Sequence, residues 1–128
     1  VTRNAQLNAG TPVYLAPEVI TNPGLRPNPS ADMFSMGMVM FFISSGRSPL
    51  ANMSNDDHLA KVRVGQLPPL SFHPRTWLLE RWAETIQDCT SKLPASRPTA
   101  SEAYDAIEMS VGLLTSRPEE VSISRSSS

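Results

Sequence analysis

A predominantly apolar run extends over residues 30–46, and its few polar positions do not gather on one side. Between residues 31 and 43 the run carries a single charge, that of Asp32. A helix that is apolar on all its faces is a buried helix, so the run predicts a central core helix with other elements packed on every side. We expect Ser30 to cap its N-terminus, Asp32 to lie in the first turn and Gly46 to follow its last residue.

Three further segments show helical periodicity. Residues 78–89 alternate an apolar and a charged side at the spacing of an amphipathic helix. A shorter helix is expected from Asn55 or Asp56 to about Gly65. A last helix is expected after residues 99–102, where a threonine and a glutamate have the spacing of a capping box. The apolar positions expected to face the core are Leu59, Val62, Leu67, Leu78, Leu79, Trp82, Ile86, Cys89, Ala103, Ile107, Val111 and Leu114.

Proline and glycine mark the parts of the chain that cannot form long helices. Residues 10–20 contain two prolines and a glycine, which predicts a constrained loop that ends in a short helical turn starting at Pro17. Residues 21–29 have turn composition throughout and predict a surface loop. Residues 115–128 contain few large apolar side chains and predict a disordered tail. With no strand-like alternation, the sequence predicts an all-α fold whose helical core spans residues 16–114.

Composition narrows the classes of function. The 128 residues fit one compact unit, and the 11 basic and 12 acidic residues give a net charge of −1 with no basic cluster. This pattern argues against a nucleic-acid binder. The apolar run is shorter than the about 20 residues that cross a membrane. Cys89 is the only cysteine, so no disulfide can form within the chain, and we expect an intracellular, cytoplasmic protein without membrane attachment.

Three motifs in the correct order resemble the C-terminal lobe of a protein kinase. Residues 10–18 resemble the end of an activation segment with its Ala-Pro-Glu motif, and residues 32–37 resemble the Asp-x-Trp-Ser-x-Gly start of the central lobe helix. Residues 89–99 resemble the Cys-Trp-x-x-Asp-Pro-x-x-Arg-Pro-Thr stretch. The resemblance covers residues 8 to 114 and implies that residues 1–15 are the end of an activation segment. Three weak motifs in the correct order are together a specific signal.

The subgroup is inferred from smaller features. Thr11, where tyrosine kinases usually carry proline, is similar to the serine/threonine pattern. The turn at residues 65–68 and the later Trp77 are most similar to tyrosine-kinase-like serine/threonine kinases of the Roco type. Phe34, Thr90 and Leu93 depart from the residues that are usual in the family, which indicates a divergent member.

The motifs that hold ATP in the kinase family do not occur in this sequence. The glycine-rich loop, the Val-Ala-Ile-Lys lysine, the His-Arg-Asp loop and the Asp-Phe-Gly aspartate are all missing. Phosphoryl transfer depends on lysine and magnesium to position and neutralise the phosphates. We therefore expect the chain alone to be inactive and to bind no cofactor, whereas the resemblance implies ATP and Mg²⁺ for a complete parent serine/threonine kinase. The missing N-lobe and catalytic loop, and a protein substrate, are the implied partners.

The resemblance assigns roles to individual residues. Gly10, Thr11 and Tyr14 would belong to the loop that positions the substrate, and Asp32 would hold the backbone of the catalytic loop. Glu18 and Arg97 are expected to pair and to lock the activation segment to the lobe; two unrelated surface charges are the alternative. Thr2, the only hydroxyl residue ahead of the loop, is the expected phosphorylation site.

Other candidate chemistry is weaker. His58, His73 and Cys89 lack the spacing of metal ligands, so no metal site is expected, and the two histidines are expected in loops or on the surface. Two classes of function remain open: part of a serine/threonine kinase, or a non-catalytic, pseudokinase-like lobe that binds other proteins. The translated sequence ahead of Val1 would distinguish them, because only the first requires the catalytic motifs there.

Overall fold

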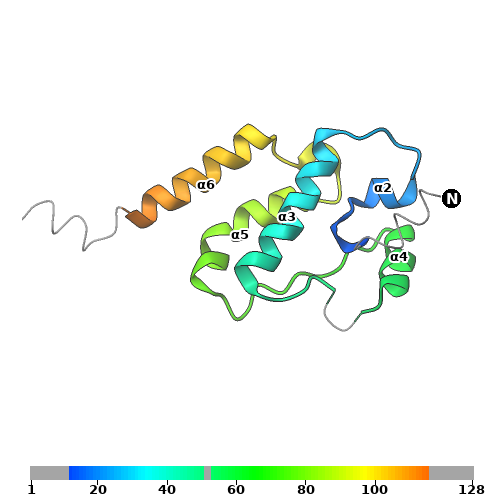
Figure 1. The fold of residues 1–128 in the computed structure, drawn as a ribbon, viewed down its shortest axis with the longest axis horizontal. Coiled ribbons are helices and arrows are strands. Elements are labelled where there is room, and N and C mark those ends of the chain that lie inside the picture. The colour runs from blue at the N-terminus through cyan, green and yellow to red at the C-terminus, as the bar shows by residue number, and fades with distance from the viewer. Residues whose placement is uncertain (1–11, 51–52, 116–128) are drawn as a thin grey trace, which may run out of the picture.

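The computed structural model describes residues 12–50 and 53–115, with the side chains of the last turn, residues 111–115, left out of the description. This part of the chain contains helices and no strand, which confirms the predicted all-α fold. The helices are η1 (Pro12–Tyr14), α2 (Pro17–Thr21), α3 (Pro29–Ser45), α4 (Asn55–Arg63), α5 (Trp77–Cys89), η2 (Pro94–Ser96) and α6 (Ala100–Thr115). In Figure 1, α3 runs through the middle, with α5 and α6 on one side and α2 and α4 on the other.

Helix α3 begins two residues earlier than expected, and Ser30 is not its N-cap. The cap is Asn28, whose side-chain oxygen accepts a hydrogen bond from the Ala31 amide at 2.9 Å. Pro29 occupies the first helical position, where its missing N–H costs nothing. Ser30 instead donates its hydroxyl to the Asn28 side chain at 2.7 Å. The helix ends as predicted at Gly46, which has a φ of 71° and therefore adopts the left-handed conformation that glycine tolerates.

Only part of the α3 surface is buried, which corrects the expectation of a helix covered on every side. Its buried residues include Phe34, Met38 and Phe41, which contact η1, α5 and the loops. The opposite stripe is open within the described part of the chain, and its members are Met36, Val39, Phe42 and Ile43, from 38% to 58% exposed. The apolar pattern of the sequence predicts that another segment packs on this stripe. It does not show whether that segment lies within the described residues.

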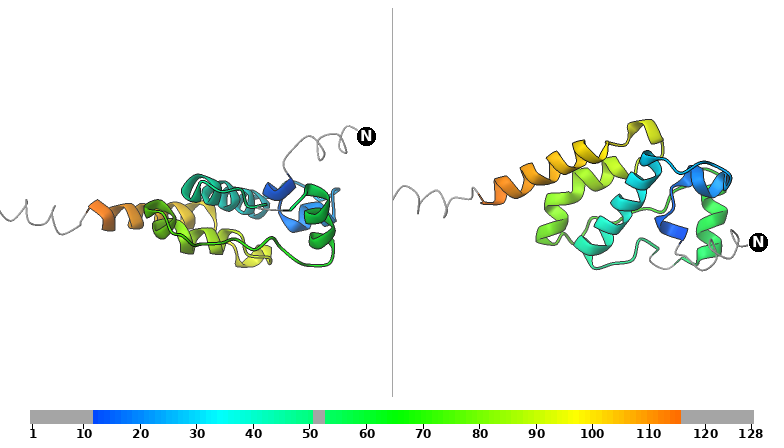
Figure 2. Two further views of the ribbon diagram at one scale, coloured as in Figure 1. Left: turned by 90° about the horizontal axis from the view of Figure 1, so that it is seen from below. Right: turned by 45° about the horizontal axis from the view of Figure 1, so that its top comes forward.

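Helices α5 and α6 pack side by side (Figure 2). Helix α5 follows the predicted amphipathic pattern, with Leu79, Ile86 and Cys89 buried, and Ala103 of α6 faces the core as predicted. The Thr76 hydroxyl caps α5 by accepting from the Leu79 amide at 3.0 Å, and it also donates to the Ser44 carbonyl at the end of α3. The predicted capping box at the start of α6 is confirmed, because Thr99 and Glu102 exchange side-chain to backbone hydrogen bonds of 2.9 and 3.1 Å. Val111 and Leu114 lie outside the described side chains.

Helix α4 packs on α2 and η1 at the other end of the molecule (Figure 1). Its N-cap is Ser54, whose hydroxyl accepts from the Asp57 amide at 3.1 Å, rather than Asn55 or Asp56. Val62 faces the core as predicted. His58 does so as well, and it is 2% exposed. The expectation of a loop or surface histidine was wrong at this position, because the inner side of α4 places residues 58 and 62 one turn apart.

His58 is buried without a hydrogen bond of normal geometry. Neither ring nitrogen has a partner among the described residues. Burial lowers the pKa of the His58 imidazole, although the nearby Pro12 carbonyl partly opposes this change. The folded chain therefore holds this ring neutral more strongly than the unfolded chain does.

We predict that this burial makes stability depend on pH. Because the folded pKa of His58 lies below its unfolded value of about 6.5, the unfolded state takes up the proton first. The free energy of unfolding should fall as the pH drops below that value, by at most about 1.4 kcal/mol per pH unit. His58→Leu should remove this part of the slope in urea unfolding between pH 7.5 and 5, whereas His73→Gln, at an exposed histidine, should retain it. An unchanged slope in His58→Leu would contradict the prediction.

Candidate functional site

The site is organised around the guanidinium of Arg97, which follows η2 and whose side chain is fully buried. Two parallel hydrogen bonds of 2.7 and 2.9 Å join its terminal nitrogens to the carboxylate oxygens of Glu18, in α2. This is the bidentate geometry for which the planar guanidinium is suited. The structure thus brings together the two residues that the sequence predicted would pair, across a separation of 79 positions.

The remaining hydrogen-bond donors of Arg97 bind backbone carbonyls. Its Nε donates to the Ser91 carbonyl at 2.8 Å, and its terminal nitrogens also reach the carbonyls of Ser30 and Lys92 at 3.0 and 3.3 Å. The guanidinium carbon lies 5.1 Å from the centre of the Phe34 ring, within the range of a cation–π contact. One side chain therefore connects α2, the start of α3 and the loop after α5.

The charge of Glu18 is favoured by this arrangement. Burial is the largest single influence and would raise the pKa of the Glu18 carboxyl, but the hydrogen bonds from Arg97, a backbone hydrogen bond and the positive charge of Arg97 together outweigh it and hold the pKa below its usual range. The carboxylate is 21% exposed and so is only partly screened by water. The pair is thus a shielded ion pair rather than two independent surface charges.

The loop ahead of Glu18 is held against α3 by a second link. The Ser35 hydroxyl donates to the Tyr14 carbonyl at 2.6 Å, while Pro12 and Val13 are buried. Tyr14 is half-buried and packs on the cluster that contains Phe34. Sequence reasoning gave Ser35 no role, although it is the serine of the motif at residues 32–37. The partner of this hydroxyl is a backbone carbonyl, which the sequence does not identify.

The other predicted site residues are not joined to this network. The Asp32 side chain is exposed in the first turn of α3, and no hydrogen bond or ion pair involves it within residues 12–50 and 53–115. It borders a hollow of about 200 Å³ between the loop at residues 22–28 and α3. Gly10, Thr11 and Thr2 lie outside the described residues.

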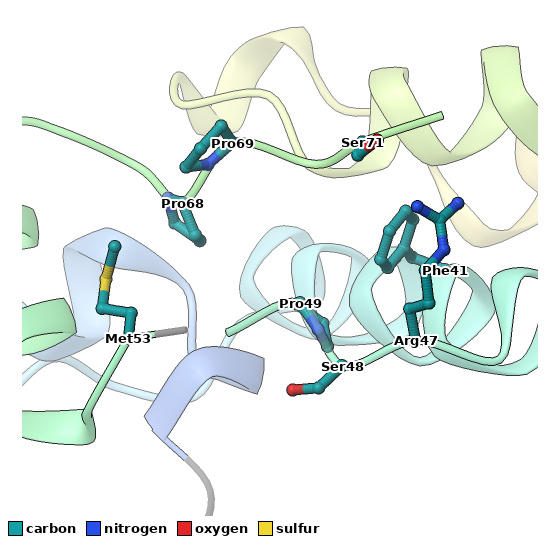
Figure 3. A pocket seen from close by; sticks show the side chains of 8 residues that line it. All are labelled: Phe41, Arg47, Ser48, Pro49, Met53, Pro68, Pro69 and Ser71. Carbon is teal, nitrogen blue, oxygen red and sulfur yellow. The ribbon is translucent and has the colours of Figure 1, made fainter. Parts of the chain in front are cut away.

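A smaller hollow of about 100 Å³ lies where the loops after α3 and α4 meet (Figure 3). Phe41, Met53 and the prolines of these loops form most of its wall. Arg47, at its edge, donates to the backbone carbonyls of His73 and Pro74 at 2.8 and 3.3 Å. With its one charged group already bonded and no acid, histidine or cysteine in its lining, this hollow offers no reactive side chain.

Cys89 and the two histidines do not form a reactive or metal-binding site in the described part of the chain. Burial, with a smaller effect of Asp88, raises the pKa of the Cys89 thiol to about 11, so the reactive thiolate is scarce at neutral pH. No group of three or more histidine, cysteine, aspartate or glutamate residues lies close enough to hold a metal ion in the part of the chain that the structure describes. Within that same part, none of the helices combines the length and apolar character required to cross a bilayer.

The fold and the buried pair together define the class of protein. An all-helical lobe arranged around one apolar helix, with Glu18 of α2 fixed to an arginine ahead of α6, is consistent with the C-terminal lobe of a protein kinase. The family model described as "Protein kinase domain" matches residues 2–106. The chain belongs to the protein kinase domain family.

Curated relatives agree with this assignment. The chain is 32% identical over 101 residues to serine/threonine-protein kinase chk-2 of Caenorhabditis elegans, an alignment that covers 73% of the chain and 19% of that protein. It is 29% identical over 108 residues to serine/threonine-protein kinase 33 of Bos taurus, covering 78% and 20%. It is 27% identical over 97 residues to Tribbles homolog 2 of Mus musculus, covering 75% and 26%. The chain spans about a fifth to a quarter of the length of these relatives.

Proposed function

We propose that the chain is the substrate-side part of a protein serine/threonine kinase, whose complete domain transfers the γ-phosphoryl group of ATP to hydroxyl groups of proteins. The names of the relatives, two of which are serine/threonine-protein kinases, support this class. In this proposal ATP and Mg²⁺ are held by the N-lobe and catalytic loop of the parent. The chain itself supplies the loop on which the substrate lies and the helices that support that loop.

The observation that carries the proposal is the buried Glu18–Arg97 pair. It fixes the end of the segment that resembles an activation segment to the loop ahead of α6, through hydrogen bonds of 2.7 and 2.9 Å. The Ser35 hydroxyl fixes the preceding turn by its bond to Tyr14. A substrate-positioning loop must be held rigidly, because small displacements at a reacting centre are costly in rate. These two links supply that rigidity.

The open apolar stripe of α3 supports the presence of further kinase elements. Met36, Val39, Phe42 and Ile43 are exposed on one face of a helix whose other face forms the core. Contiguous exposed apolar surface usually marks a contact with another element or protein. We infer that the parts of the parent domain that hold the catalytic loop cover this stripe. The carboxylate of Asp32, exposed at the start of the same helix, would then meet the backbone of that loop.

The roles of the remaining residues are also part of the proposal. Gly10, Thr11 and Tyr14 position the substrate, and Thr2 is the phosphorylation site of the segment, which phosphopeptide mapping of the parent protein would test. The turn at residues 65–68 and Trp77 support a tyrosine-kinase-like kinase of the Roco type. An intracellular, cytoplasmic location with protein substrates, and without nucleic-acid or membrane partners, agrees with the nearly balanced charge of the chain.

We predict that purified residues 1–128 bind no Mg²⁺-ATP, because every phosphate-holding motif of the family is absent from the sequence. Isothermal titration calorimetry should show no heat of binding with millimolar nucleotide, and a radiolabel assay should show no phosphoryl transfer. The parent protein that contains this chain should bind Mg²⁺-ATP under the same conditions. Binding by the isolated chain, or its absence in the parent, would contradict the proposal.

A non-catalytic, protein-binding lobe is the second candidate, and the open stripe of α3 favours it equally. In that case the parent would carry this lobe without a functional catalytic loop. The translated sequence ahead of Val1 distinguishes the two. His-Arg-Asp and Asp-Phe-Gly motifs at the proper spacing would support the kinase, and their replacement by an unrelated domain would support the binding module.

A further inference from the structure

A groove lies between α2, α4 and the loop that follows α5, and residues of all three line it. Its volume is about 270 Å³. Pro17 and Val62 are buried beneath it, while Leu93 stands at its edge with 65% of its surface exposed. The groove therefore has an apolar floor and one exposed aliphatic wall. We call it the α2–α4 groove.

Two cationic side chains border the α2–α4 groove. Arg63 ends α4, and Lys92 belongs to the loop opposite. Within residues 12–50 and 53–115, neither side chain takes part in an ion pair or a hydrogen bond. Glu18, the one acid in the lining, has its charge compensated by Arg97. The groove thus presents a local positive charge on a chain whose net charge is −1.

The Lys92 ammonium lies close to Gly65, just beyond the end of α4. Its Nζ lies 2.9 Å from the point that a Cβ atom on Gly65 would occupy, and Gly65 has a φ of 88°. Glycine is required here by the backbone conformation, which side-chain-bearing residues rarely adopt. The ammonium lies beyond the C-terminal end of α4, where the helix dipole favours a cation. Both cations consequently flank the apolar floor at one end of the helix.

We propose that the α2–α4 groove binds a segment of a partner protein in which acidic residues flank an aliphatic side chain. The carboxylates would pair with Arg63 and Lys92, and the aliphatic side chain would cover Val62 and Leu93. Complementary charge on the rim steers association and selects the partner, while burial of the aliphatic side chain supplies affinity. This inference does not depend on kinase activity, because no residue of the groove takes part in holding ATP.

The first test uses the full chain and a fluorescein-labelled peptide of sequence Gly-Glu-Leu-Glu-Leu-Glu-Gly, followed by fluorescence anisotropy. Arg63→Glu and Lys92→Glu should each weaken binding about tenfold or more, because like charges then face the peptide. Arg81→Glu makes the same change of charge at an exposed position of α5 that does not line the groove. It should leave the affinity within about twofold. Both groove residues are exposed, so urea unfolding should show that all three variants remain folded.

The second test separates the aliphatic contact from simple attraction of anions. Replacing the leucines of the peptide by serine, or Leu93 by serine in the protein, should weaken binding, and raising the salt concentration should weaken it further. Equal binding of the serine peptide or of inorganic phosphate would overturn the proposal in favour of a general anion site. Binding to phosphatidylserine vesicles without binding to the peptide, equal affinity of Arg63→Glu, or no peptide binding at millimolar concentration would also overturn it.

Discussion

Replacing Arg97 by alanine is expected to lower the free energy of unfolding by about 3–5 kcal/mol, the range found when one partner of a buried ion pair is removed. The substitution leaves the Glu18 carboxylate without its partner, and it leaves the carbonyls of Ser30, Ser91 and Lys92 without a donor. Arg97→Lys should recover only a part of the loss, because an ammonium cannot bind both carboxylate oxygens in parallel. Denaturant unfolding with a two-state fit measures each value.

The chain provides a matched control for this experiment. Arg75 and Glu80 form the other ion pair of the described residues at 3.2 Å, with side chains 33% and 54% exposed. Such an exposed pair is worth about 0–1 kcal/mol, so Arg75→Ala should have little effect. A double-mutant cycle on Glu18 and Arg97 isolates their coupling. Coupling below about 0.5 kcal/mol would show that the pair does not interact in solution.

The Glu18–Arg97 pair should also be sensitive to acid. Since the folded pKa of the Glu18 carboxyl lies below its unfolded value, its contribution to stability is complete above the unfolded value, which is about 4.3. The contribution disappears as the pH falls through the lower folded pKa. The cost of Arg97→Ala should therefore be largest near neutral pH.

Adding one methyl group at Gly37 is expected to destabilise the chain by about 1–3 kcal/mol, the usual cost of overpacking a core. A Cβ atom at this position would lie 2.7 Å from the Cβ of Cys89 and 2.8 Å from the Cγ2 of Thr90. The Cβ of Cys89 is held directly by the α5 backbone and cannot swing aside. The two helices would have to separate, and this cost should exceed the about 1 kcal/mol that alanine gains over glycine within a helix.

Gly24 supplies the control for that substitution. It lies in the exposed loop ahead of α3, and the nearest atom to an added Cβ would be the Asn22 side-chain oxygen at 3.7 Å, an ordinary contact. Gly24→Ala should therefore be neutral or slightly stabilising, through a reduced entropy of the unfolded chain. If Gly37→Ala unfolded at the same denaturant concentration as the wild type, the close packing of α3 on α5 would be refuted.

The parts of the fold that could be predicted are those that depend on local spacing. The stripe of α5, the capping box of Thr99 and Glu102, and the left-handed Gly46 all follow from neighbours within a few positions. The Ser30 cap was wrong because Asn28 and Pro29 together make a better start for α3 than a serine one residue later. The burial of His58 was missed because no neighbouring residue indicates that the η1 loop would cover the inner side of α4.

In the candidate site, too, the contacts between distant segments could not be predicted from local spacing. The contact of Glu18 with Arg97 could be expected only through motifs known from a family, since nothing in the 78 intervening residues indicates it. The hydrogen bond from the Ser35 hydroxyl to the Tyr14 carbonyl could not be predicted. Every residue carries a backbone carbonyl, so the sequence does not indicate which one accepts the bond. The open stripe of α3 could not be predicted either, because the sequence of a helix shows that it needs an apolar partner but does not show which segment supplies one.

The 79-position separation of the Glu18–Arg97 pair also has a consequence for protein synthesis. At about 5–20 residues per second, Arg97 is made roughly 4–16 seconds after Glu18. During that interval Glu18 has been made without Arg97. The Ser91 and Lys92 carbonyls, which also accept hydrogen bonds from the guanidinium, are made only shortly before Arg97. The Ser35 link to the loop ahead of Glu18 is available early in the synthesis of these residues, whereas the ion-pair anchor of the same loop waits until the loop that follows α5 has been made.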